Sequence, residues 1–584
     1  MTLLEQLEQQ LKTICHQAFP DLPNFVPEIR RPTQTGIADF SSSAALMLFG
    51  QLSPTAKANF STPTALAEFL KQQLEKIKLD SNSVFKNLEI TVASPGFINF
   101  ILPPAHYLQL LNSLKQTSKL LTQTTKPQKY LVEYSSPNIA KPFTVGHLRS
   151  TIIGQSIANL LKAAGHQVFR DNHVGDWGTQ FGKQIYAIKT WGNETELDQS
   201  QNPAKELVTL YVKFHQAAET DSTLEDAARA WFQKLETGDP EARRLWQKCI
   251  DWSWKEFDRI YQKLEVTFTE NKGRGYGESF FETQMAAVVA EIKAKKLLTS
   301  SQGAELVFFP NDQFPPLMIT KKDGSSLYST RDLATDKFRL SHYGKDVIII
   351  NEVGAEQQLY FQQLFALEQL LGWVKPNQRI HIKHGLIRFK TGKMSTRKGN
   401  VVWLDEVLTE AFARTQTIAG QRLIETELWK IALGAIKWND LKRNCEQPIS
   451  FDWNEVLRLE GNSGPYLQYA YTRCLSVLTQ VKANQDLEIL TWPETATDQD
   501  LNLLKKIIQY DESVMRATEH LAPHFVCTYL FELAQTFNSW YANHSVLKAP
   551  TPQLQNLRWQ LVKLVARVLK EGLELLGIAV LEKM

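Results

Sequence analysis

A loop and the start of the helix after it carry side chains that could bind phosphate. An apolar stretch at residues 130–134 is typical of a β-strand, and a polar, proline-containing turn leads from it to His147. A helical pattern of apolar residues then runs to a predicted stop at Gly165. A helix N-terminus offers an anion free backbone N–H groups and the positive end of the helix dipole. Lys141 and Thr144 add donors beside His147, so the segment predicts a phosphate site.

A second segment of this kind lies far along the chain. Residues 393–399 read Lys-Met-Ser-Thr-Arg-Lys-Gly. A cation on a mobile loop can contact a pyrophosphate leaving group mainly in the transition state, where binding raises the rate. A lone Gly-His turn before a helix is more often structural than functional. A lone Lys-Met-Ser tripeptide occurs by chance and indicates no function. Together, in this order and context, the two segments favour nucleotide chemistry.

The two segments resemble the paired HIGH and KMSKS signatures of class I aminoacyl-tRNA synthetases. Residues 133–142, Glu-Tyr-Ser-Ser-Pro-Asn-Ile-Ala-Lys-Pro, narrow the resemblance to the arginyl-tRNA synthetase form of the first loop. Residues 173–182, 328–334 and 464–470 are similar to the same family. The resemblance runs from the first predicted helix to Met584, which is essentially the whole chain.

Two positions depart from the family signatures. Thr144 stands where the first histidine of HIGH is expected, and its hydroxyl can still donate to a phosphate oxygen. Thr396 replaces the second lysine of KMSKS. The resemblance implies that Lys141, just upstream of HIGH, supplies the missing charge. The alternative for Lys141 is an ordinary solvated loop lysine.

The resemblance implies a set of residues for the reaction with ATP. The expected catalytic residues are Lys141, Thr144, His147 and Lys393. The expected ATP-binding residues are Gly146, His147, His384, Lys393 and Ser395.

An arginine substrate presents a planar guanidinium with five N–H donors, so its pocket should offer carboxylates and other acceptors. The resemblance implies that Glu133 and Asn138 hold the backbone end of arginine, and that Tyr328, Asp332 and Gln357 line the guanidinium end. Tyr328 and Asp332 are four residues apart, which places both on one face of a helix. The alternative for Asp332 is a helix-start carboxylate paired with a nearby Lys or Arg.

Composition bounds the class of protein. A chain of 584 residues is too long to fold around a single hydrophobic core, so we expect ~3–4 domains. With 43% hydrophobic residues and a net charge of only +3, composition neither demands nor excludes a nucleic-acid partner. The five cysteines are dispersed without a CxxC pair, which indicates reduced, mostly buried residues. With neither a signal peptide nor a long apolar run, we expect a soluble cytoplasmic protein without membrane contact.

The expected fold is multidomain α/β. An N-terminal α+β domain at residues 1–120 contacts tRNA by resemblance. A Rossmann-like catalytic domain with a parallel sheet follows at 121–450 and is interrupted by a helical insertion at about 190–300. Ligands of such sheets bind beyond the carboxyl ends of the strands. The expected strands are residues 130–134, 167–171, 306–309, 317–320, 346–350 and 380–383.

Residues 451–584 are expected to form an all-α bundle that resembles the family's anticodon-binding domain. Tyr466 and Tyr469 are three residues apart at a predicted helix start, which suits stacking on unpaired bases. The resemblance also places Met584 near the anticodon loop. The alternative for Met584 is an ordinary frayed terminus.

The function implied is arginine–tRNA ligation. Arginine reacts with ATP to form arginyl-adenylate, and the arginyl group then passes to the terminal adenosine of its tRNA. Mg²⁺ is expected with ATP, without a protein-built metal cage, and the chain is expected to act as a monomer. Two alternatives stay open. One is a catalytically inactive relative that is retained as an RNA-binding protein; Thr144 and Thr396 support it. The other is a class I ligase for another amino acid such as cysteine, against which the missing zinc-ligand cluster counts.

Overall fold

The computed structural model describes residues 3–32, 38–78, 88–117, 119–321, 328–389, 402–481 and 489–584. The chain divides into two compact units. The first comprises Met1–Thr117, Asn484–Lys505 and Lys548–Arg558, and the second comprises Ser118–Ala483, Lys506–Leu547 and Trp559–Met584.

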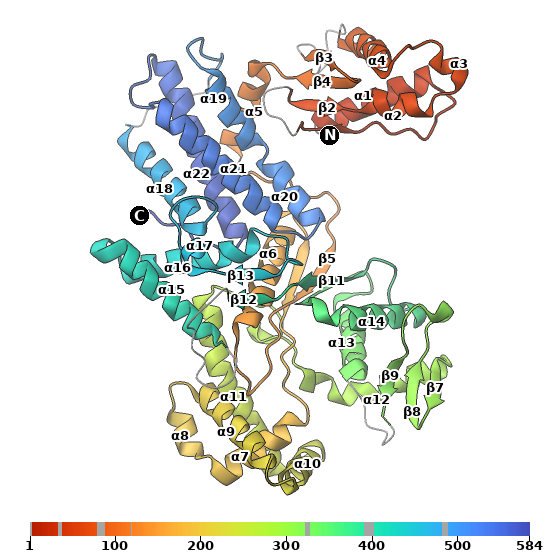
Figure 1. Ribbon diagram of the computed structural model, residues 1–584, viewed down its shortest axis with the longest axis vertical. Helices are drawn as coiled ribbons and strands as arrows, with labels where there is room; N and C mark the ends of the chain where they lie inside the picture. The colour runs from red at the N-terminus through yellow and green to blue at the C-terminus, as the bar shows by residue number, and fades with distance from the viewer. Residues whose placement is uncertain are drawn as a thin grey trace. The chain divides into compact units, whose positions relative to one another are not determined.

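The N-terminal part of the first unit is a small α+β layer (Figure 1). Its antiparallel strands follow the order β1-β2-β4-β3. Apolar residues at helical spacing in α1 and α4 bury Leu11 and Leu70 completely. The elements are α1 (Leu3–Ala18), β1 (Ile29–Arg30), β2 (Phe40–Ser42), α2 (Ala44–Gln51), α3 (Pro54–Lys57), α4 (Pro63–Lys78), β3 (Glu89–Ala93), β4 (Phe97–Ile101) and α5 (Pro104–Gln116).

A four-stranded parallel sheet forms the centre of the second unit, in the order β11-β10-β5-β6. Its strands are β5 (Lys129–Glu133), β6 (Gln167–Asp171), β10 (Ile348–Gly354) and β11 (Arg379–His384). Ile349 and Ile350 of β10 are completely buried, as expected for a strand covered on both faces. The predicted strand at 346–350 therefore exists, but β10 continues to Gly354 because Asn351 finds buried polar partners.

The strands expected at 306–309 and 317–320 belong to a different sheet. They form β8 (Ala304–Val307) and β9 (Leu317–Thr320), which pair with β7 (Leu298–Ser301) in an antiparallel sheet of three. Before them, the region expected to be a helical insertion is α8 (Glu194–Gln199), α9 (Pro203–Ala218), α10 (Thr223–Glu236), α11 (Pro240–Lys263), η1 (Asn271–Gly273), η2 (Glu278–Gln284) and α12 (Met285–Ala294).

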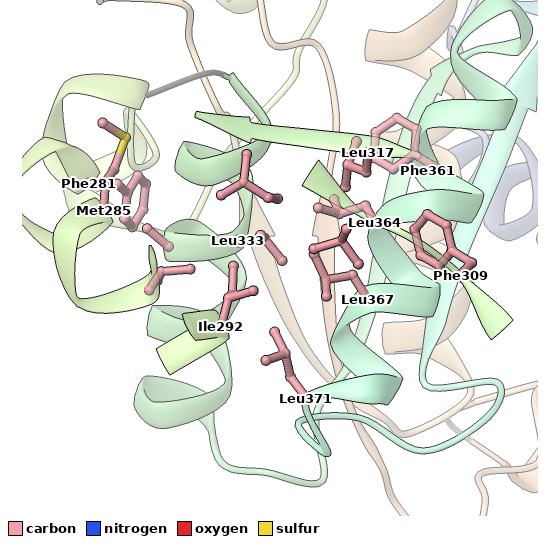
Figure 2. Close-up of a cluster of buried hydrophobic side chains, with 14 residues drawn as sticks. Phe281, Met285, Ile292, Phe309, Leu317, Leu333, Phe361, Leu364, Leu367 and Leu371 are labelled. Atoms are coloured by element: carbon pink, nitrogen blue, oxygen red, sulfur yellow. The ribbon is translucent and has the colours of Figure 1, made fainter. Parts of the chain in front are cut away.

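One apolar cluster fixes the two helices that follow this sheet, α13 (Tyr328–Tyr343) and α14 (Gln358–Leu370). Leu333 of α13 and Leu364 and Leu367 of α14 meet there with Leu317 of β9, as Figure 2 shows. Leu333 and Leu367 are completely inaccessible, and truncating such a side chain to alanine costs about 2–5 kcal/mol. The cluster therefore fixes the positions of α13 and α14 relative to each other.

The helix predicted after the first loop is α6 (Val145–Ala163). It is buried on most sides, and Gly165 ends it at φ 94° with a hydrogen bond from its N–H to the carbonyl of Lys162. Later helices of the second unit include α7 (Gln180–Trp191), α15 (Leu404–Ala419) and α16 (Glu425–Leu441).

The C-terminal region is helical, as expected. The short pair β12 (Ile387–Phe389) and β13 (Ile449–Phe451) precedes it. Its helices are α17 (Trp453–Val456), α18 (Gly464–Gln480), α19 (Asp498–Ile508), α20 (Tyr510–Glu519), α21 (His524–Asn543) and α22 (Pro552–Leu575). In the part of the chain that the structure describes, no helix combines the length and apolar character needed to cross a membrane.

Candidate active site at the carboxyl edge of the parallel sheet

A cleft of about 530 Å³ opens beyond the carboxyl ends of the parallel strands. Most of the residues predicted from the sequence line it: Glu133, Asn138, Thr144, Gly146, His147, Tyr328, Asp332, Gln357 and His384. Lys141 is half-buried and does not line the cleft. Lys393 and Ser395, like Thr396, lie outside the described residues.

The loop between β5 and α6 has an unusual backbone. Ser135, Ser136 and Ala140 take positive φ values of 74°, 42° and 57°, which L-residues rarely adopt. Side chains hold these backbone N–H groups in place: Ser150 Oγ accepts from Ser135 at 2.9 Å, and Ser253 Oγ accepts from Ala140 at 3.0 Å. The neighbouring elements therefore impose the loop conformation that opens the cleft.

Asn138 is held against the loop that follows β6. The N–H of Ile139 donates to the carbonyl of Gly175 at 3.1 Å, and the N–H of Gly175 donates to the carbonyl of Pro137 at 3.0 Å. A Cβ at Gly175 would lie 2.2 Å from Asn138 Oδ1. A larger residue at this position would therefore displace the side chain of Asn138.

Thr144 and His147 form the first turn of α6. The backbone N–H of Thr144 donates to His147 Nδ1 at 3.0 Å, so in the neutral ring the proton is on Nε2. Thr144 Oγ1 lies 3.0 Å from the same nitrogen. Burial, aided by the charges of His384 and Lys141, lowers the pKa of His147 to about 4. At neutral pH His147 is therefore an uncharged N–H donor at the helix N-terminus.

The lowered pKa of His147 predicts a pH effect on stability. Between about pH 6.5 and 4 the unfolded chain binds a proton that the folded chain does not, so this residue's contribution falls as the solution becomes more acidic. Over this range, we expect the free energy of unfolding to fall by up to about 3 kcal/mol more in the wild-type protein than in His147→Gln. Thermal unfolding of both proteins at several pH values measures it, and parallel curves would contradict it.

His384 lies at the end of β11 and pairs with Glu352. Its Nδ1 lies 2.9 Å from Glu352 Oε1, so Nδ1 carries the proton that this carboxylate accepts. Burial alone would lower the pKa of His384, but Glu352 raises it. The carboxylate therefore orients the ring at the wall of the cleft.

A buried chain of charges connects the cleft to the sheet. Arg339 Nη2 lies 2.6 Å from Glu133 Oε2 and 2.7 Å from Asp171 Oδ2, and its Nη1 lies 3.2 Å from Asp336. Asn351 donates to Glu133 Oε2 at 3.0 Å. Arg339 and Asn351 therefore fix Glu133 in the lining of the cleft.

Arg379 of β11 extends this chain. Its guanidinium contacts Asp336, lies 2.7 Å from Glu368 and donates to Asn351 at 3.0 Å. Burial raises the pKa of Glu368 far above its ordinary value, whereas Arg379 and Arg339 overcome burial and lower the pKa of Asp336. The neutral Glu368 carboxyl can then donate a hydrogen bond to the charged Asp336.

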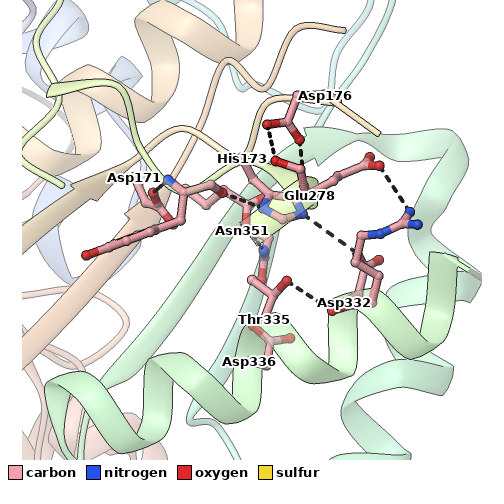
Figure 3. Close-up of polar contacts among 12 residues, drawn as sticks. Asp171, His173, Asp176, Glu278, Asp332, Thr335, Asp336 and Asn351 are labelled. Atoms are coloured by element: carbon pink, nitrogen blue, oxygen red, sulfur yellow. Dashed lines mark hydrogen bonds and ion pairs between the residues drawn. The ribbon is translucent and has the colours of Figure 1, made fainter. Parts of the chain in front are cut away.

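Asp332 lines the cleft with 28% of its side chain exposed, and no described Lys or Arg pairs with it. Its Oδ2 accepts from the hydroxyl of Tyr360, and its Oδ1 lies 4.0 Å from His173 Nε2. Burial raises its pKa, against the charge of His173. Figure 3 shows Asp332 with His173 and Glu278 in the same polar cluster. This favours a ligand cation over the alternative of a helix-start ion pair.

Three residues of this cluster were not among the predicted site residues: His173, Glu278 and Tyr360. His173 follows β6 directly, and the rule that ligands bind beyond the carboxyl ends of parallel strands could have identified it. Glu278 begins η2 and Tyr360 lies in the first turn of α14. No spacing in the sequence connects these two to Asp332.

A second cavity, also of about 530 Å³, lies within the helical C-terminal region and beside α15. Tyr466, Tyr469 and Met584 line it together. Tyr469 is 41% exposed, and the Arg473 guanidinium lies 4.8 Å from the centre of its ring. Asn538 donates to the Tyr466 hydroxyl at 2.8 Å. The cavity thus joins an exposed aromatic face to a cation, as stacking on a base requires.

All five cysteines are free, and four of them are buried. Among the described residues, no three His, Cys, Asp or Glu side chains are grouped as a metal ion would require.

Family models match almost the whole chain. "tRNA synthetases class I (R), catalytic domain" covers residues 109–453, "Arginyl tRNA synthetase N terminal domain" covers 3–102 and "DALR anticodon binding domain" covers 467–584. The arginine–tRNA ligase of Clostridium botulinum is 42% identical over 78% of this chain and 80% of its own length. That of Fusobacterium nucleatum is 37% identical over 97% of both chains.

Solved structures share the fold. The arginyl-tRNA synthetase of Plasmodium falciparum superposes with a TM-score of 0.82 at 23% identity and covers 100% of this chain and 99% of its own. The Thermus thermophilus enzyme gives 0.79 at 22% identity and covers 100% of each chain.

Proposed function

The chain belongs to the arginyl-tRNA synthetase family of class I synthetases, and we propose that the cleft described above is where it activates arginine. An ATP-dependent arginine–tRNA ligase joins the arginine carboxylate to the α-phosphate of ATP and releases pyrophosphate. It then transfers the arginyl group to the 3′-terminal adenosine of tRNA and releases AMP. The observation that carries the proposal is Asp332, a carboxylate without a described Lys or Arg partner, in the same cleft as a helix N-terminus with neutral donors.

His147, Gly146 and Thr144 form the proposed phosphate end of the cleft. The Nε2–H of His147 and the backbone N–H of Gly146 would donate to phosphate oxygens as charge develops on them. The N–H groups of Val145 and His147 already donate to the carbonyls of Val402 and Thr144. A Cβ at Gly146 would meet only Thr144 Oγ1, at 3.4 Å, so the space left free there belongs to the cleft. We propose that His384 contacts the nucleotide from the opposite strand, β11.

Asp332, with Tyr328 and Gln357, forms the proposed guanidinium end, and Asn138 the backbone end. Tyr328 lies edge-on to Tyr360, and their ring centres are 4.9 Å apart. The hydroxyl of Tyr360 donates a hydrogen bond to Asp332. The resemblance placed Glu133 at the backbone end of arginine, but we propose that it acts at the guanidinium end. Its charge acts on both Asp332 and His173, so it belongs to the same acidic region.

Lys393 and Ser395 are proposed from the family resemblance to neutralise the pyrophosphate leaving group. Because the motif has Thr396 in place of its second lysine, a further cation is needed. Lys141 is the proposed substitute. It is close enough to His147 for its charge to help lower the pKa of that ring, which places a cation near the phosphate end.

Lys141→Ala is expected to lower the rate of arginine activation by at least ~10²-fold, which is about 2.7 kcal/mol of transition-state stabilisation. Lys126→Ala, which removes an exposed lysine ahead of β5, is the matched control and should change the rate by less than about threefold. Single-turnover adenylation measures both. A loss below about threefold at Lys141 would mean that it is not the substitute cation.

The proposed anticodon site is the cavity of Tyr466, Tyr469 and Met584. The Tyr469 ring and Arg473 could stack on a base, and Met584 would contact its neighbour. We propose the domain limits 1–120, 121–450 and 451–584, with the first domain contacting the D-loop corner of the tRNA.

ATP is proposed to enter as its Mg²⁺ complex, with the metal belonging to the substrate. We propose a cytoplasmic location because five free cysteines suit a reducing compartment. We also propose a monomer, since a single chain lines both the cleft and the anticodon cavity. Light scattering at low concentration would reveal a dimer.

Exchange of pyrophosphate into ATP tests the proposed activity against a silent, RNA-binding relative. With arginine and tRNA present, we expect exchange that depends on both. In this family, activation generally needs tRNA, so reactions without tRNA are the control. No exchange at high protein concentration would refute the ligase and favour the silent relative.

A further inference from the structure

His173 lies at the wall of the cleft with both ring nitrogens facing oxygen atoms. Its Nδ1 lies 2.9 Å from the carbonyl oxygen of Tyr276. Its Nε2 is buried, has no hydrogen-bond partner and lies 4.0 Å from Asp332 Oδ1. Only 12% of the side chain is exposed. A buried polar atom without a partner at the edge of a cleft is rare and points to a ligand.

The carbonyl oxygen of Tyr276 and the carboxylate of Asp332 determine which nitrogens of His173 carry protons. A carbonyl oxygen only accepts, so Nδ1 of His173 carries a proton. In a neutral ring Nε2 would then present a lone pair to the carboxylate of Asp332, which is repulsive. A second proton on Nε2 turns this contact into attraction between an imidazolium and a carboxylate. The empty cleft therefore favours the charged ring.

Charged groups from every neighbouring element act on this ring. Glu133 at the end of β5, Asp332 on α13 and Glu278 on η2 favour the imidazolium, whereas Arg339 on α13 opposes it. Asp176, in the same loop as His173, is held by Ser279 and adds negative charge. Burial alone would lower the pKa of His173, but the carboxylates raise it overall. Figure 3 shows Asp176, Glu278 and Asp332 around the ring.

We propose that His173 is a specificity-determining residue: its imidazolium is the counter-ion of Asp332 in the empty cleft, and it gives up its Nε2 proton when the guanidinium of arginine arrives. This inference rests on the proposed function, since it takes arginine as the substrate. The N–H bond at Nε2 breaks and the proton passes to solvent. The lone pair left on Nε2 then accepts an N–H of the guanidinium, which has five to donate.

The proposal connects arginine binding to pH. Lowering the pH stabilises the imidazolium and so the empty cleft, and KM for arginine rises as the pH falls through the pKa of His173. The limiting slope is about tenfold per pH unit. A neutral isostere such as citrulline has no charge to replace the imidazolium and should release no proton. The ring thereby adds to discrimination between a guanidinium and an uncharged group.

Calorimetric titration with L-arginine, in buffers of different ionisation enthalpy near pH 7, measures the proton release directly. The full-length protein is titrated with and without tRNA. We expect wild-type protein to release roughly half to one proton per arginine, and His173→Gln to lose most of that release. The acid rise in the KM for arginine should flatten in His173→Gln.

Two variants make the test specific. Burial raises the pKa of Glu278 to about 7, so Glu278 is the other group at this wall that could supply a proton. Glu278→Gln should retain most of the release. If Glu278→Gln abolishes it and His173→Gln does not, the carboxyl is the source and the proposal is overturned. His215→Gln, on α9 and outside the cleft, should behave like wild type.

The wild-type measurement stands even if His173→Gln does not fold, because the absence of proton release on arginine binding overturns the proposal by itself. Failure of the proposed function looks different, since a protein that neither binds nor activates arginine gives no arginine-dependent heat and no exchange. A protein that activates arginine and binds it without releasing a proton contradicts the His173 inference alone.

Discussion

Asp332→Asn is expected to lower kcat/KM for arginine by roughly 10³-fold, which is about 4 kcal/mol. The carboxylate accepts from Tyr360 and has no described Lys or Arg partner, so the substrate guanidinium can replace His173 as its counter-ion. An asparagine of the same shape removes the charge and points an amide N–H at the N–H groups of the guanidinium. KM for ATP should change by less than about threefold, because His147 and the start of α6 remain intact. Steady-state activation assays give both constants.

Glu356→Gln is the control for this prediction. Glu356 is an exposed carboxylate that lines the same cleft, so its variant removes the same formal charge from the rim. We expect a loss below about fivefold, since an exposed charge is screened by solvent. Equal losses in Asp332→Asn and Glu356→Gln would mean that the overall charge of the cleft, and not the pocket around Asp332, selects arginine.

Arg379→Met is expected to lower the free energy of unfolding by about 3–5 kcal/mol. Arg379 is fully enclosed and contacts Asp336, Glu368 and Asn351. Methionine fills part of the volume but leaves the charge of Asp336 with Arg339 as its one cationic contact among the described residues. Because Asp336 belongs to α13, which also carries Asp332, activity should fall as well. The thermal midpoint and the arginine KM measure the two effects.

Arg414→Met provides the comparison at the surface. Arg414 pairs with Glu410 at 2.7 Å, and both side chains are more than two-fifths exposed. Such pairs contribute less than about 1 kcal/mol because water screens them. If both variants lowered the thermal midpoint equally, the buried network would have no special part in stability.

Much of the cleft could be predicted because it follows chain-local rules. The apolar strand at 130–134, the turn after it and the helix ending at Gly165 are contiguous signals, and the structure confirms each. The carboxyl ends of parallel strands meet at one edge, so Glu133 and His384 come together although they are far apart in sequence.

Other features needed information that the chain does not carry locally. The strands β8 and β9 have the right pattern, but pattern alone does not tell which sheet a strand joins, and they pair with β7 instead. The expected strand ends at residue 350, but β10 continues through Asn351 to Gly354. The partners of Asn351 are Glu133 and Arg379, which other strands contribute.

The acidic cluster illustrates the same limit at the site. Asp332 could be identified, but its isolation from every described Lys and Arg is a property of three-dimensional packing. Glu278 and Tyr360 reach it from η2 and α14, whose positions depend on the apolar cluster shown in Figure 2. The role of Lys393 stays a prediction, because its motif lies outside the described residues.

The most direct test of the central claim is aminoacylation of unfractionated tRNA with each amino acid in turn. A cleft that pairs the carboxylate of Asp332 with a guanidinium should charge tRNA with arginine, and lysine should be disfavoured by roughly 10⁴-fold because it leaves acceptors unpaired. Charging with arginine alone is the predicted result. Charging with any other amino acid at a comparable rate would contradict the assignment of the cleft.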